Sequence, residues 1–186
     1  MAKAKKKHLG FKECLNSYLL SSKLVITEAF NHHPTQKTMI GINIFLTGDI
    51  AHIPSLKNQK IQGTNILRPA PRAKLVAMTK LYEVKSPKIC FDEPIHVFIS
   101  CAYRPNRFDT DNVLTTVKDW LEPRFIRQKD RGWGVGIVPN DYHVNGYAKR
   151  KIKGEFNSDC TEIIIRKDSY IKQYLDIFLK GFGDER

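Results

Sequence analysis

The chain has 186 residues, of which 41% are hydrophobic, and a formal net charge of +12 from 31 Lys and Arg against 19 Asp and Glu. This length and apolar fraction favour one globular domain with terminal additions and argue against global disorder. The charge favours a nucleic-acid or anionic-membrane partner, but no apolar run approaches the roughly 20 residues of a membrane span.

The first ten residues form a lysine-rich tail. No clean apolar segment or small-residue cleavage site follows it, so we expect no signal peptide and a cytoplasmic or nucleoid-associated protein. Residues 12–30 are compatible with one or two short helices, which His32-His33-Pro34 would end. Residues 40–47 alternate apolar and polar side chains, which predicts a strand.

The middle of the chain begins with residues 48–72, which are rich in Pro and show no periodicity, so we expect a long loop. Residues 72–84 have the apolar spacing of an amphipathic helix, and residues 94–103 alternate as a strand does. A further helix is predicted over residues 109–121, and Pro123 closes it.

The last third is predicted to contain mostly strands. We expect a short strand at 136–138, a turn at 139–141, a basic strand at 142–153, a buried strand at 161–167 and a final helix at 170–182. This order indicates an α+β domain with a single mixed β-sheet, hairpin-like in its C-terminal half, and extra helices at both ends. The predicted divisions are a basic tail (1–10), an N-terminal helical extension (11–36), the main domain (37–168) and a C-terminal helix (169–186).

The four cysteines are widely separated and form no Cys-x-x-Cys pair: Cys14, Cys90, Cys101 and Cys160. We expect reduced, mostly buried thiols and no zinc site.

The most informative motif is Asp109-Thr110-Asp111-Asn112, at the start of the predicted helix 109–121. A doubly acidic N-cap is the simplest interpretation, because helix N-termini favour negative charge. A divalent cation facing phosphate is the alternative, since two adjacent carboxylates are otherwise out of place in so basic a chain.

A second acidic turn, Asn140-Asp141, follows the predicted helix. Mg²⁺ takes oxygen ligands and is held by a few carboxylates, with water and substrate phosphate completing its shell. The metal-site hypothesis therefore requires Asp109, Asp111 and Asp141 to converge on Mg²⁺ or Mn²⁺ in the fold. His143, two residues from Asp141, has a better claim to a site role than the isolated His52 and His96, which we expect to be structural.

These motifs resemble those of the RusA-type Holliday junction resolvases. The similarity includes Asp109-Thr110-Asp111-Asn112, the segment from Val138 to His143, and the upstream loop Pro54-Ser55-Leu56-Lys57-Asn58, and it extends over about residues 40–167. It implies an α+β homodimer that cuts four-way junctions or other branched DNA with Mg²⁺ or Mn²⁺, with Asp109, Asp111 and Asp141 as catalytic carboxylates.

The chain departs from the family pattern at several positions. Thr115 stands where the family often has Lys, so Lys118, or Lys149 or Lys151 from the following strand, would have to supply the catalytic cation. Asn140 and His143 replace the first Asp and the Gln of the family's D-D-x-Q turn.

The candidate nucleic-acid-binding residues come from the predicted loop, two basic segments and a strand. They are Lys57, Asn58, Lys60, Arg104, Arg107, Lys149 and Lys151. Tyr103, Phe108 and Trp133 are candidates to stack on unpaired bases, although core packing is the simpler role for Phe108.

The sequence therefore favours a metal-dependent endonuclease for branched DNA, acting by paired phosphodiester hydrolysis as a homodimer. The first alternative is a non-catalytic nucleic-acid-binding protein, in which the acidic residues only cap and turn the chain. A metal-dependent glycosyltransferase is a weaker alternative, because the βαβ series of a nucleotide-binding half is missing from the pattern.

Overall fold

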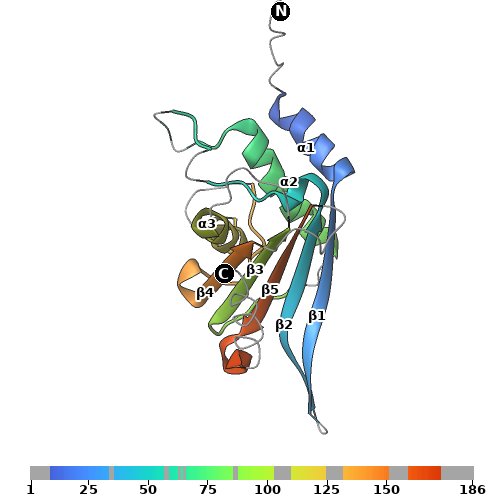
Figure 1. Ribbon diagram of the computed structural model, residues 1–186, viewed down its shortest axis with the longest axis vertical. Coiled ribbons are helices and arrows are strands. Elements are labelled where there is room, and N and C mark those ends of the chain that lie inside the picture. Colours follow the sequence, from blue (N-terminus) through green and yellow to red (C-terminus); the bar gives the residue numbers. More distant parts are fainter. Residues whose placement is uncertain are drawn as a thin grey trace, which may run out of the picture.

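The computed structural model describes residues 9–33, 36–56, 59–62, 64, 66–85, 88–102, 110–124, 132–150 and 159–172. It confirms the α+β prediction, with one mixed sheet of five strands in the order β1-β2-β5-β3-β4 (Figure 1). The helices are α1 (Phe11–Ser21), α2 (Pro69–Lys85) and α3 (Thr110–Leu121). The strands are β1 (Lys23–His33), β2 (Gln36–Thr47), β3 (Ile95–Ala102), β4 (Val144–Arg150) and β5 (Cys160–Lys167).

The helical prediction for the N-terminal segment is correct only for α1. From Lys23 onward the chain is the edge strand β1, which pairs antiparallel with β2. The physical reason is a period of two: Leu24 faces Leu46 and is 3% exposed, whereas its neighbour Val25 is 54% exposed. Pairing with β2 fixes this segment as a strand, a contact that local propensity does not reveal.

The expected hairpin pairing in the C-terminal half is wrong. β4 runs parallel to β3, and β5 lies between β2 and β3, antiparallel to both. A parallel pair needs a long crossover, and here the crossover from β3 to β4 includes α3. Residues 136–138 form no strand, although the backbone of Ile137 bonds to Phe91 and Leu121.

The core lies between one face of the sheet and helices α2 and α3. Across the three central strands it is built from aligned rows: Leu46–Thr161–Cys101, Ile44–Ile163–Ile99 and Ile42–Ile165–Val97. Helix α2 adds Leu75 and Met78 to this core, and α3 adds Val117 and Trp120. Burial of these apolar surfaces, rather than helix propensity, holds the helices in place.

The predicted loop 48–72 contains short structured segments. It begins with the 3₁₀ turn η1 (Gly48–Ala51), and an isolated bridge joins Lys60 to Leu67 before α2 starts. Thr161 of β5 donates a hydrogen bond of 2.6 Å to the carbonyl oxygen of Ala51, which attaches the loop to the sheet.

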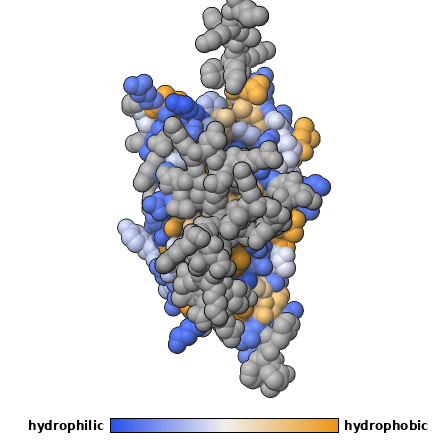
Figure 2. Space-filling model, in the orientation of Figure 1, coloured by the Kyte–Doolittle hydropathy of each residue, from blue (hydrophilic) through white to orange (hydrophobic). Residues whose placement is uncertain are grey.

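All four cysteines are free, and three of them are buried, as predicted for most of these thiols. Cys90, just before β3, is the exposed one. Over the visible described surface in Figure 2, hydrophilic residues alternate with scattered apolar ones. Within the described ranges, no helix combines the length and the apolar character needed to cross a membrane.

Candidate functional site

The acidic motif lies at the N-terminus of α3, and its described part begins at Thr110. Asp111 is exposed in the first turn, whereas Asn112 is buried. The hydroxyl oxygen of Thr116 lies 2.9 Å from the carbonyl oxygen of Asn112 and 2.8 Å from that of Pro54. This contact places the first turns of α3 against the loop at Pro54.

Asp141 opens the 3₁₀ turn η2 (Asp141–His143) that leads into β4. Its backbone N–H donates a hydrogen bond of 2.9 Å to the carboxylate of Glu122, which is fully buried just after α3. The side chain of Asn140 accepts from the N–H of Tyr142 and lies 2.8 Å from Nδ1 of His143. Asn140 therefore caps the turn and positions His143.

The described contacts do not join Asp111 to Asp141. Glu122 follows the C-terminal end of α3, and eleven residues of helix rise correspond to about 16 Å along the axis from Asp111. Asp109 lies outside the described residues. Within the described ranges, no group of three or more His, Cys, Asp and Glu side chains could hold a metal ion. The shared Mg²⁺ or Mn²⁺ site stays a prediction.

Few of the other predicted site residues belong to the described part of the chain. Lys118 lies half-buried in the last turn of α3, and Lys60 is exposed before α2. Lys149 pairs with Ser100 through its backbone in β4, but its side chain is outside the described residues. Lys57, Asn58, Arg104, Arg107, Lys151, Tyr103 and Phe108 also lie outside them. Trp133 is 5% exposed in the hydrophobic core, so its prediction as a base-stacking residue is wrong.

Exposed Lys and Arg side chains lie along α2 and in the segments before and after it. We call this group the α2 basic surface, and it consists of Lys60, Arg68, Arg72, Lys80, Lys85 and Lys88. The acid among the described residues 59–88 is Glu83, and it forms an ion pair with Arg124. In this segment the exposed cations therefore outnumber the acid.

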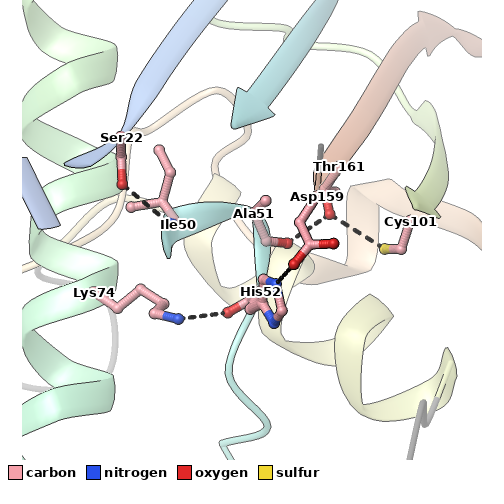
Figure 3. Close-up of polar contacts among 8 residues, drawn as sticks. All are labelled: Ser22, Ile50, Ala51, His52, Lys74, Cys101, Asp159 and Thr161. Carbon is pink, nitrogen blue, oxygen red and sulfur yellow. Dashed lines mark hydrogen bonds and ion pairs between the residues drawn. The ribbon is translucent and has the colours of Figure 1, made fainter. Parts of the chain in front are cut away.

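A polar cluster that the sequence analysis did not predict lies beside η1 (Figure 3). His52 Nε2 is 2.7 Å from a carboxylate oxygen of Asp159, and both side chains are 43% exposed. Lys74 of α2 donates a hydrogen bond of 3.0 Å to the carbonyl oxygen of His52. Burial lowers the pKa of Lys74, and the nearby Asp49 partly opposes this effect. The sequence gives little sign of the cluster, since 107 positions separate His52 from Asp159.

Comparisons with known proteins give few matches. No family model and no curated protein matches the chain. One similar solved structure is the periplasmic domain of Helicobacter pylori MotB (residues 90–256), with 8% identity, a TM-score of 0.30, and coverage of 86% of this chain and 91% of that chain. Another is the periplasmic domain of MotB (residues 64–256), with 11% identity, a TM-score of 0.32, and coverage of 100% and 98%. At such low TM-scores, the likeness transfers neither function nor location to this chain.

The prediction of a Mg²⁺-dependent endonuclease for branched DNA is corrected by these findings. None of the comparisons gives a nuclease, since the similar structures are MotB periplasmic domains. The assignments as an enzyme, a hydrolase, a junction resolvase and a protein of DNA recombination or repair are therefore not retained.

Proposed function

We propose that the chain is a non-catalytic nucleic-acid-binding protein that contacts the phosphate backbone through the α2 basic surface. The observation that supports this proposal is the charge of that surface: its cations are exposed, and they outnumber Glu83, the acid of the described residues 59–88. The opposite side of α2 is buried in the core, so the helix presents its cations from a rigid base.

The physical basis of the proposal is counterion release. Each phosphate neutralised by Lys or Arg frees a condensed cation, so affinity falls steeply with salt. Branched DNA, such as a four-way junction, is the partner implied by the family resemblance, and we retain it as the preferred form. A homodimer, implied by the same resemblance, would present two α2 basic surfaces to such a symmetric substrate.

The test is fluorescence anisotropy with labelled four-way junction, linear duplex and single-stranded DNA over a series of salt concentrations. Wild type should bind with a strongly negative slope of log affinity against log salt. Arg72→Ala and Lys80→Ala should each weaken binding to all sequences alike and reduce the magnitude of the slope by about 1.

The matched control is Lys23→Ala, which removes an exposed cation from β1. Its neighbour Leu24 is in the core, so the side chain of Lys23 lies on the opposite face of the sheet. It should leave the salt slope of wild type nearly unchanged. Equal losses in Lys23→Ala and in the α2 variants would show only a general charge effect and would contradict the proposed surface. If none of the three DNAs is bound in a salt-dependent manner, the proposed function is wrong.

The same experiment also tests whether binding depends on divalent cations. No step of the proposed binding is assigned to Mg²⁺. Repeating the titrations with Mg²⁺ and with EDTA, on wild type and Asp111→Asn, tests the predicted ion. A Mg²⁺-dependent gain in affinity that Asp111→Asn loses would support it.

A further inference from the structure

The ribbon of β1 and β2 extends beyond the rest of the sheet. β5 pairs with β2 from Gly41 to Thr47, whereas β1 and β2 remain paired as far as His33 and Gln36 (Figure 1). Residues 30–33 and 36–39 therefore form a two-stranded arm, which we call the projecting ribbon. Four residue steps of strand correspond to a reach of about 13 Å.

Two features determine where the ribbon leaves the sheet. The register shifts between Ala29 and Phe30, which is a β-bulge, and such bulges bend a strand and increase its twist. On the neighbouring strand, a Cβ atom at Gly41 would lie 1.9 Å from the carbonyl oxygen of Ile165. Glycine is thus required for β2 to pass β5 closely before it enters the ribbon.

The ribbon carries hydrogen-bonding and cationic side chains. Asn31 and Gln36 are exposed, and the pairing of Asn31 with Thr38 places these three residues on one face. Lys37 is exposed on the other face, with its ammonium nitrogen 3.9 Å from the ring centroid of Phe30. The sequence contains no Asp or Glu between Glu28 and Asp49.

We propose that the projecting ribbon enters the major groove of duplex DNA, with Asn31 and Gln36 toward the base edges and Lys37 toward a phosphate. This inference rests on the proposed nucleic-acid-binding function. A major groove about 12 Å wide and about 8.5 Å deep admits a two-stranded ribbon of this reach. Asn and Gln pair bidentately with adenine in that groove, and the absence of acids avoids repulsion by phosphate.

The experiment combines binding with chemical protection of a linear duplex. Wild type should protect guanine N7, in the major groove, from dimethyl sulfate more than it protects adenine N3, in the minor groove. The double variant Asn31→Ala, Gln36→Ala should lose this protection and bind the same linear duplex at least about fivefold more weakly. Weak, salt-dependent binding to linear duplexes of any sequence should remain, because the α2 basic surface is intact.

The control is Thr27→Ala, an exposed substitution on β1 within the sheet, which should behave as wild type. If the ribbon variant equals this control while Arg72→Ala weakens binding, the ribbon inference fails and the proposed function stands. If wild type binds no DNA, both fail. A ribbon variant that changes the oligomeric state in light scattering, with DNA protection unchanged, would instead assign the ribbon to self-association and overturn the inference.

Discussion

At the residue scale, the buried carboxylate of Glu122 is the polar contact that fixes the turn before β4. It is fully buried and accepts the backbone N–H of Asp141. A backbone donor in such a place needs a partner, because an unsatisfied buried group costs about 1–3 kcal/mol. Glu122 thereby couples the end of α3 to the start of η2.

Glu122→Ala should therefore lower the free energy of unfolding by about 1–3 kcal/mol, since the N–H of Asp141 loses its acceptor. Glu122→Gln keeps an acceptor oxygen and should lose less. Urea denaturation followed by circular dichroism measures both. Equal destabilisation by the two substitutions would indicate that the charge of Glu122, rather than its bond to Asp141, is what matters.

Lys74 is the second residue with an unusual environment. Its ammonium group lies between the carbonyl oxygen of His52 and the ring of Tyr18, 5.2 Å from the ring centroid. Burial lowers the pKa of Lys74 from 10.5 and raises that of Tyr18 from 10.0. Both groups are thus held closer to their neutral forms in the folded chain.

The lowered pKa of Lys74 predicts a pH dependence of stability. Between this pKa and the unfolded value of 10.5, the unfolded chain binds more protons, so stability should rise with pH. Above 10.0, the raised pKa of Tyr18 acts in the opposite direction, because the unfolded chain then releases its proton first. Lys74→Met should flatten this rise in unfolding free energy on the alkaline side, up to the unfolded value of 10.5.

Urea unfolding at several pH values checks this expectation, with Lys80→Met as the control on the exposed side of α2. The same alkaline rise in wild type and in Lys74→Met would contradict it.

Residue patterns revealed some of these groups and not others. The Asp109–Asn112 motif is visible because its members are adjacent in sequence. The polar cluster of His52, Asp159 and Lys74 was not visible, because its members come from three separate segments and each is unremarkable alone. Hydrogen bonds of this kind follow from the fold and cannot be derived from local spacing.

At the element scale, the spacing of apolar residues predicted the strands in which apolar and polar residues alternate clearly and the helices in which apolar residues recur regularly. β2, β3, β5, α2 and α3 all lie within a few residues of their predicted positions. β1 was missed because Cys14 to Phe30 contains a helix followed directly by a strand, and apolar residues of both appear as one irregular run. The break at Ser22 carries no Pro or Gly to mark it.

Gly41 is the position at which an element depends most clearly on one residue. Gly41→Ala should destabilise the protein strongly, by several kcal/mol, because the new methyl group would overlap the backbone of Ile165. Gly10→Ala is the matched control, since its nearest heavy atom would be 3.8 Å away. Thermal unfolding of both variants measures the difference, and a Gly41→Ala protein as stable as wild type would show that β2 and β5 separate at little cost.

At the scale of the whole molecule, composition predicted the fold class and the positive charge but not the order of the strands. The strand order depends on which apolar rows meet, such as Ile44 with Ile163 and Ile99, and those pairings join residues far apart in sequence. The same limit applies to function. Charge indicates a polyanionic partner, whereas the local D-x-D motif overstated the case for catalysis.

The position of β5 also bears on how the protein is made. In the described sheet, β5 lies between the pair β1-β2 and the unit β3-α3-β4, and it is the last of the described strands in sequence. During translation, the edges of β2 and β3 that pair with β5 stay unpaired until Cys160–Lys167 has left the ribosome. Open strand edges of this kind invite intermolecular pairing. The nascent chain should therefore depend on chaperones until β5 emerges, and polypeptides released before that point should aggregate.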